Sequence, residues 1–157
     1  MSWTFGRGTL RFLCDSTYNV NMKTTNYFDT FIEVADDCPV HSAEIPSQKR
    51  DGKTVAYLQY ELIINHPYMY TSDDVLFQVF VQRTNIQTDT LPEERSKFFS
   101  KGQPCFRSSP LAKRYGWGIH SNSEGKLAIY SVQSEEYKQL VSRQDIRHLK
   151  AMRSKQG

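Results

Sequence analysis

The chain has 157 residues, of which 38% are hydrophobic and 13% aromatic, and this size is enough to bury a core without disulfides or metals. Twenty Lys and Arg against seventeen Asp and Glu give a net charge of +3, with the basic residues spread along the chain. This balance argues against a dedicated nucleic-acid binder, in which a basic excess gathers on one face.

The cysteine content favours a reducing compartment. Cys14, Cys38 and Cys105 are odd in number, lie far apart and form no CxxC pair. The sequence also has no apolar run long enough for a transmembrane helix or a secretory signal. We therefore expect a cytoplasmic protein without membrane association, and homo-oligomerisation is left open.

The first 21 residues lack the periodicity of a helix or a strand, whereas a well-patterned segment begins near Met22. We interpret residues 1–21 as an N-terminal extension, either loosely attached or upstream of the true start. The alternative is an ordinary terminal strand over residues 9–13. Residues 22–157 are predicted to form a single α+β domain.

The first well-patterned segment predicts a strand followed by a long loop. Apolar and polar residues alternate over residues 27–35, as expected for a strand. Residues 36–53 are rich in Pro, Ser, Gly and charged residues, which is typical of a loop. Because this loop is longer than most connections between elements, it is a candidate binding loop.

Helical spacing of apolar residues predicts three helices in the middle of the chain. The first follows Thr54 and ends near Pro67, and the second covers residues 72–84. The hydroxyl of Thr71 and the carboxylate of Asp74 suit a reciprocal cap for the second helix. Pro92 opens a shorter helix that ends near residue 100.

The last third of the chain predicts a hairpin, a short helix and a strand. Residues 115–120 and 126–132 are two apolar and aromatic runs joined by turn residues, Ser134 caps a helix, and residues 146–152 alternate. The predicted fold class is therefore α+β, a mostly antiparallel sheet of about four strands with helices packed on one face.

Four strings of this sequence are distinctive: NYFDTFIEVADDCPV (26–40), YTSDDVLFQVF (70–80), KGQPCFRSSPLAKRYGWGIHSNSEGK (101–126) and KAMRSK (150–155). Together they resemble a family of short bacterial proteins known only as a domain of unknown function. The resemblance covers nearly the whole chain from Met22 onward. It implies no activity, substrate, cofactor or catalytic residue.

The run from Lys101 to Arg114 contains the densest collection of polar and reactive groups. Two prolines and a glycine are expected to keep its backbone irregular, so that amide groups, hydroxyls and guanidinium groups converge on a phosphate or carboxylate. No named phosphate motif is present, and such residues often serve the loop's own hydrogen bonds. The predicted contacts are Arg107, Ser108, Ser109, Arg114 and Trp117.

Aromatic residues of the hairpin extend this hypothesis. Tyr115, Trp117 and Tyr130 lie in or beside its strands, where an aromatic face can stack a ring or simply pair across strands. If the loop folds over that face, a mixed aromatic and cationic pocket results. We therefore expect a binding module for a small anionic or nucleotide-like ligand at residues 101–120.

One alternative is a cysteine-dependent hydrolase or transferase. Cys105 would be the nucleophile and His120 the base, with Asp73, Asp74 or Glu124 as the orienting acid. A lone cysteine between Pro and Phe is more often a packing residue.

Another alternative is a protein-protein interaction domain, in which the aromatic face docks a partner. The four histidines and Cys38 show no ligand spacing beyond the isolated pair of Cys38 and His41, so the sequence predicts neither a metal site nor a cofactor. Whether the protein is an enzyme stays open at this stage.

Overall fold

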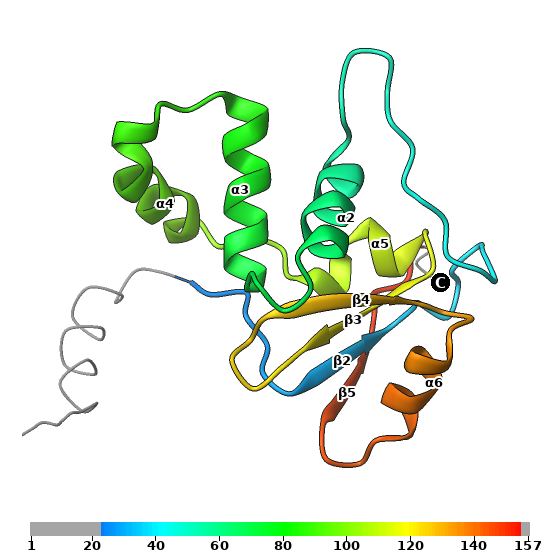
Figure 1. Ribbon diagram of the computed structural model, residues 1–157. Helices are drawn as coiled ribbons and strands as arrows, with labels where there is room; N and C mark the ends of the chain where they lie inside the picture. Colours follow the sequence, from blue (N-terminus) through cyan, green and yellow to red (C-terminus); the bar gives the residue numbers. More distant parts are fainter. Residues whose placement is uncertain (1–22, 155–157) are drawn as a thin grey trace, which may run out of the picture. The chain divides into compact units, whose positions relative to one another are not determined.

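The computed structural model describes residues 23–154, so the predicted N-terminal extension lies outside the described residues. Contacts divide the described chain into two compact units. The larger unit comprises residues 25–86 and 104–154, and the smaller comprises residues 23–24 and 87–103. The larger unit contains the sheet and most of the helices, which confirms the predicted α+β fold (Figure 1).

The sheet has four strands in the order β4-β3-β2-β5. Strands β2 (Thr30–Glu33), β3 (Trp117–Ser121) and β4 (Leu127–Ser131) pair antiparallel, whereas β5 (Arg147–Lys150) runs parallel to β2. The predicted hairpin is the β3-β4 pair. The sheet is therefore mixed but mostly antiparallel, as expected.

Two helices begin at the caps that the sequence predicts. Helix α2 (Val55–Asn65) follows Thr54, whose side chain accepts a hydrogen bond from the backbone N–H of Tyr57. Helix α3 (Ser72–Thr84) follows Thr71, and a complete capping box joins Thr71 to Asp74. These caps satisfy N–H groups that have no partner inside the helix, which is why they mark its start.

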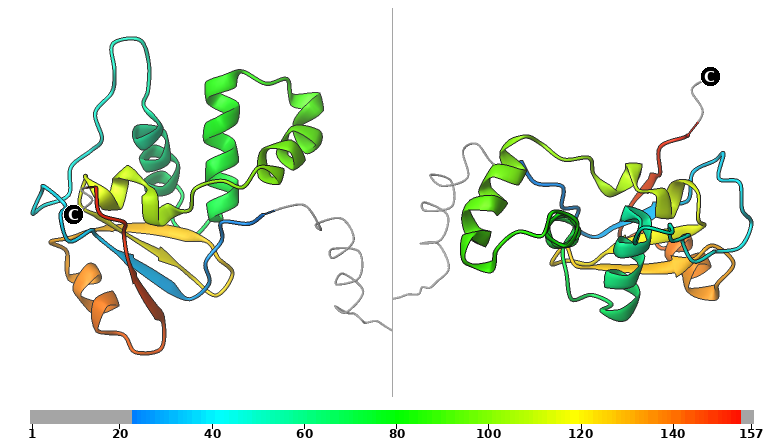
Figure 2. Two further views of the ribbon diagram at one scale, coloured as in Figure 1. Left: turned by 180° about the vertical axis from the view of Figure 1, so that it is seen from behind. Right: turned by 90° about the horizontal axis from the view of Figure 1, so that it is seen from above.

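Both faces of the sheet are covered by apolar residues. Successive residues of β2 point to opposite sides of the sheet, so neighbouring residues belong to different clusters. Ile32 joins a core with residues of α2, α3 and the segment 106–112, while Phe31 packs with Tyr137 and Leu140 of α6 (Glu135–Ser142). The prediction of helices on one face is therefore wrong in this respect. Figures 1 and 2 show α6 on the side of the sheet opposite α2 and α5.

The segment expected to be irregular contains two short helical elements. They are η2 (Phe106–Ser108) and α5 (Pro110–Lys113). Pro110 starts α5 instead of preventing it, because a proline at the first helical position needs no N–H partner and has a suitable φ. Phe106, Leu111 and Ala112 are almost completely buried. Burial of these side chains explains why the segment is ordered locally.

The smaller unit contains η1 (Thr88–Thr90) and α4 (Leu91–Ser100), with Pro92 in the first turn of α4 as predicted. The rings of Phe98 and Phe99 pack edge to face, with their centroids 4.9 Å apart. The N–H of Lys23 donates to the carbonyl of Phe99 at 3.1 Å.

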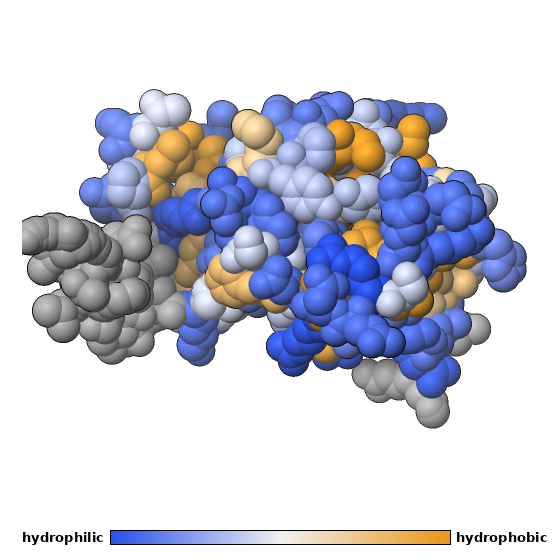
Figure 3. Space-filling model, turned by 60° about the horizontal axis from the view of Figure 1, so that its bottom comes forward, coloured by the Kyte–Doolittle hydropathy of each residue, from blue (hydrophilic) through white to orange (hydrophobic). Residues whose placement is uncertain are grey.

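The side of the larger unit that carries α6 is mostly hydrophilic in the space-filling view of Figure 3, with hydrophobic atoms in separate places. None of the helices within residues 23–154 combines the length and the apolar character that crossing a membrane requires. In that view, the hydrophobic atoms of this side do not merge into one continuous apolar patch.

Replacement of Gly118 by alanine should destabilise the protein by about 1 to 3 kcal/mol, because the added methyl group would overpack the interior at this position. The added Cβ would lie 2.5 Å from Cε2 of Tyr137 and 2.6 Å from Cζ of Phe31. Urea denaturation followed by circular dichroism measures the change. Ser131→Ala, on the neighbouring strand and partly exposed, is the control. Equal stability of the two variants would contradict the packing of α6 on the sheet.

Candidate functional site

Helix α5 lies at the end of the 101–114 segment, and its anchoring places Lys113 and Arg114 near the surface. The hydroxyl of Ser109 caps α5 by accepting from the N–H of Leu111 at 3.2 Å, and it donates to Oε1 of Gln59 at 2.7 Å. Leu111 and Ala112 then turn into the core. The next two residues, Lys113 and Arg114, are consequently half-buried and exposed, respectively.

The long loop of residues 36–53 is held against the hairpin by hydrogen bonds to the backbone of Glu44. The N–H of Glu44 donates to the carbonyl of Tyr115 at 2.9 Å, and Nε1 of Trp117 donates to the carbonyl of Glu44 at 2.8 Å. Gly116 permits this approach: its φ is +79°, and a Cβ there would lie 3.1 Å from Cα of Ala43. At its other end, Thr54 Oγ1 donates to the carbonyl of Ser47 at 2.9 Å.

These two segments and the start of α2 enclose a hollow of about 480 Å³, which we call the cationic hollow. It carries three cationic side chains, those of Lys49, Lys113 and Arg114, and no Asp or Glu lines it. The other lining residues are Ser47, Thr54, Val55, Ala56, Ser108, Pro110 and Tyr115.

The three cations of this hollow are uncompensated. Within residues 23–154, the side chains of Lys49, Lys113 and Arg114 form no ion pair and no hydrogen bond. Thr54, Val55 and Ala56 place the N-terminal end of α2 at the same hollow, and the first turn of α2 has no acidic residue. The helix dipole therefore adds to the positive potential there.

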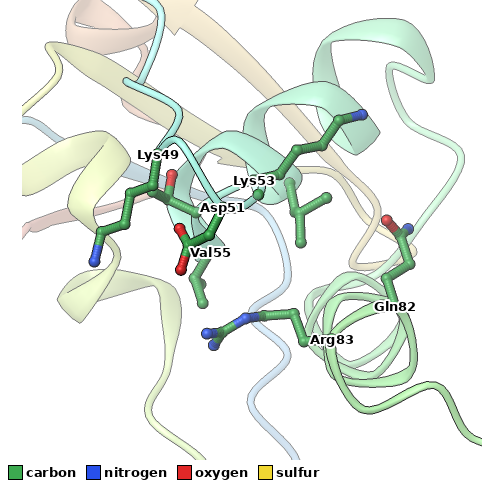
Figure 4. Close-up of a pocket in the computed structure, with 9 residues that line it drawn as sticks. Lys49, Asp51, Lys53, Val55, Gln82 and Arg83 are labelled. Carbon is green, nitrogen blue, oxygen red and sulfur yellow. The ribbon is translucent and has the colours of Figure 1, made fainter.

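A second hollow of about 610 Å³, which we call the mixed hollow, shares Lys49, Thr54 and Val55 with the first. Figure 4 shows the Asp51 carboxylate and the Arg83 guanidinium extending into this space from different elements. The remaining lining residues are Gly52, Lys53, Leu58 and Gln82. Lys53 contributes little charge, since its Nζ binds both carboxylate oxygens of Glu61 at 2.8 and 3.0 Å.

Only part of the predicted contact set reaches a hollow. Arg114 and Ser108 line the cationic hollow, although the Ser108 hydroxyl donates to the carbonyl of Cys105 at 2.7 Å. Ser109 is buried and serves α5. Nε of Arg107 donates to the carbonyl of Lys150 at 2.8 Å, which holds the guanidinium at the end of β5. Arg107 and Ser109 thus support the backbone, as the alternative reading of this loop expected.

Trp117 also has a structural role, since both its indole N–H and its ring contact other parts of the chain. Its indole N–H is used by Glu44, and its ring packs against Tyr60 with centroids 5.3 Å apart. Trp117 lines neither of the two hollows, whereas the half-buried Tyr115 lines the cationic one. Of the hairpin aromatics, Tyr115 is therefore the residue placed to contact a ligand in this hollow.

Cys105 and His120 lie on opposite faces of the sheet. His120 shares a face with Gly118, whose missing Cβ would meet Phe31 and Tyr137. Cys105 precedes Phe106, which packs in the core on the other face. The structure therefore does not bring these two residues together as a nucleophile and its base, because the sheet separates them.

The thiol of Cys105 has a different neighbour. Its Sγ accepts a hydrogen bond from the hydroxyl of Tyr27 at 3.2 Å. Burial, and then this hydrogen bond, raise the pKa of Tyr27 to about 12. The tyrosine is consequently protonated at neutral pH and acts as a donor, not as a base that activates the thiol.

The acidic residues proposed as orienting groups also have local roles. Asp74 belongs to the capping box of α3, and Oδ1 of Asp73 accepts from the N–H and the hydroxyl of Thr25 at 2.8 and 2.7 Å. Glu124 lies in the hairpin turn, 3.4 Å from Nζ of Lys126. No set of three or more His, Cys, Asp or Glu within residues 23–154 is arranged to hold a metal ion.

His120 is buried and instead belongs to a hydrogen-bonded chain with two partly buried tyrosines. Its Nδ1 lies 2.8 Å from the hydroxyl of Tyr68, which in turn lies 2.8 Å from the hydroxyl of Tyr130. Burial, followed by the positive charge of Arg143, lowers the pKa of His120 below its ordinary value of 6.5, although Asp29 and Asp145 act in the opposite direction. The imidazole is therefore neutral at physiological pH.

Ser47, Lys49 and Thr54 line the cationic hollow but are not among the contacts that the sequence predicted. The loop that carries Ser47 and Lys49 is recognisable by its length, and it is the predicted candidate binding loop. Thr54 is recognisable only as a helix cap. The pairing of this loop with residues 113–115 depends on long-range contacts, for which no local signal exists.

Acidification should destabilise the protein through His120. Because the pKa of His120 is lower in the folded state, the unfolded chain binds more protons, and the free energy of unfolding should fall as the pH drops below about 6.5. Urea denaturation of the parent protein and of His120→Gln between about pH 8 and pH 5 measures this change in the free energy of unfolding, because that interval spans the ordinary histidine pKa of about 6.5.

The His120→Gln variant should lose part of this pH dependence, because it has no titrating group at this position. The control His41→Gln changes an exposed histidine and should retain the dependence of the parent protein. An identical dependence in the His120→Gln variant and the parent would show that His120 is not the buried group responsible.

The comparisons with known proteins identify a family and no activity. A family described as a family of unknown function, DUF6157, matches residues 22–157. No curated protein and no solved structure matches the chain. The chain belongs to the DUF6157 family, in agreement with the resemblance that its sequence strings indicate.

Proposed function

We propose that this member of the DUF6157 family binds a small oxyanion in the cationic hollow. The observation that carries the proposal is the convergence of Lys49, Lys113 and Arg114 on one concave surface without a carboxylate among its lining residues. Like charges repel one another, so such an arrangement is most stable when an anion occupies it. Guanidinium and ammonium groups are the usual protein ligands of phosphate and carboxylate.

The dimensions and the neutral groups of the hollow support a small ligand. A volume of about 480 Å³ lies within the range of about 300 to 1,000 Å³ common for small-molecule sites. The hydroxyls of Ser47 and Tyr115 line it and can donate to an oxyanion, and they lie 3.5 Å from each other. Tyr115 also supplies the aromatic surface that a nucleotide-like ligand would contact.

Binding is supported better than catalysis by the same residues. The hollow is lined by cations, hydroxyls and apolar side chains, and no His, Cys, Asp or Glu is among them. Cys105, the predicted nucleophile, does not line it. A site with this lining can hold and orient an anion, and it lacks the His, Cys, Asp and Glu side chains that most often act as acid, base or nucleophile.

Removal of one cation should weaken phosphate binding about fivefold, which corresponds to about 1 kcal/mol for a partly exposed charged hydrogen bond. Isothermal titration of inorganic phosphate into the protein, Lys113→Gln, Arg114→Gln and the double variant measures this. We expect the two losses to combine in the double variant. Binding should also weaken as ionic strength rises, because the charges are only partly buried.

The control for charge is Lys138→Gln, which removes one positive charge from α6 on the other face of the sheet. This variant should bind phosphate like the parent protein. Absence of phosphate binding to the parent, or equal losses in Lys138→Gln and Lys113→Gln, would refute the assignment of the site to the cationic hollow.

A further inference from the structure

The mixed hollow adjoins the cationic hollow but has a different chemical character. The two share Lys49, Thr54 and Val55 among their lining residues, so they meet at the start of α2. The mixed hollow adds one carboxylate, one guanidinium and one amide, those of Asp51, Arg83 and Gln82. Val55 and the buried Leu58 supply its apolar surface.

Asp51 and Arg83 extend into this space without neutralising each other. Within residues 23–154 neither side chain takes part in an ion pair, and Figure 4 shows both directed into the hollow. An ionised carboxylate only accepts hydrogen bonds, and a guanidinium only donates them. A group that is both donor and acceptor therefore satisfies the two at once.

A hydroxyl is such a group, and several hydroxyls on one small ring or chain would reach Asp51, Gln82 and Arg83 together. The carboxylate of Asp51 also disfavours a second phosphate in this hollow, because like charges repel. Apolar surface from Val55 and Leu58 suits the carbon skeleton of the same molecule.

We infer that the two hollows form one bipartite site for the phosphate ester of a polyhydroxylated compound. The phosphate group occupies the cationic hollow, and the hydroxylated body occupies the mixed hollow between Asp51 and Arg83. This inference rests on the proposed function, and it adds the class of ligand: a sugar phosphate, or the ribose phosphate part of a nucleotide.

The test compares inorganic phosphate, ribose 5-phosphate and unphosphorylated ribose by isothermal titration. Ribose 5-phosphate should bind at least about tenfold more tightly than inorganic phosphate, since it engages both hollows. Asp51→Asn and Arg83→Gln should each remove most of this advantage. Neither should weaken the binding of inorganic phosphate by more than about twofold, because that ligand needs only the cationic hollow.

Two controls separate a local effect from a change in overall charge or stability. Asp145→Asn removes a carboxylate in the segment that follows α6, where Oδ2 of Asp145 lies 2.7 Å from Nη2 of Arg143. Lys138→Gln removes a cation of α6. Both controls should bind ribose 5-phosphate like the parent protein. Thermal melting of every variant establishes that it is folded before its affinity is compared.

The outcomes distinguish this inference from the proposed function. If inorganic phosphate binds and depends on Lys113 and Arg114, but ribose 5-phosphate binds no more tightly, the bipartite site is refuted and the anion site stands. The same holds if Asp51→Asn and Arg83→Gln leave the affinity for ribose 5-phosphate unchanged. If neither phosphate compound binds to the parent protein, the proposed function itself is refuted.

Discussion

Burial of strand β2 on both of its faces is the constraint on which the larger unit depends. Phe31 and Ile32 are adjacent, point to opposite sides and are both fully buried. Two apolar clusters must therefore cover the sheet, one from α2, α3 and α5 and one from α6. The same arrangement separates Cys105 from His120, since any residue on one side of the sheet is screened from the other.

The candidate site depends on how the long loop is held beside the hairpin. The N–H of Glu44 donates to the carbonyl of Tyr115, and the indole N–H of Trp117 donates to the carbonyl of Glu44, so these two contacts hold the loop through its backbone and do not involve the side chain of Lys49. Lys49 is thus left to meet Lys113 and Arg114 in one hollow. Trp117 therefore acts on the cationic hollow only indirectly, by holding the loop that carries Lys49.

The polar interior on the α6 side illustrates a separate physical principle. The hydroxyls of Tyr68 and Tyr130 and the imidazole of His120 form a continuous hydrogen-bonded chain that is partly shielded from solvent. Burial raises the pKa of Tyr68 and lowers that of His120, so both groups are neutral at physiological pH. Neutral groups that bond to each other can be buried at a far lower cost in free energy than charged ones.

The sequence alone determined the features that depend on neighbouring residues: the capped starts of α2 and α3, the β3-β4 hairpin and the α+β class. Caps, turns and hydrophobic periodicity act over a few residues and are readable in the chain. The tertiary structure decided the parallel β2-β5 pair, the second covered face and the meeting of Lys49 with Lys113 and Arg114. These features join residues far apart in the chain, and only packing of the whole core selects such contacts.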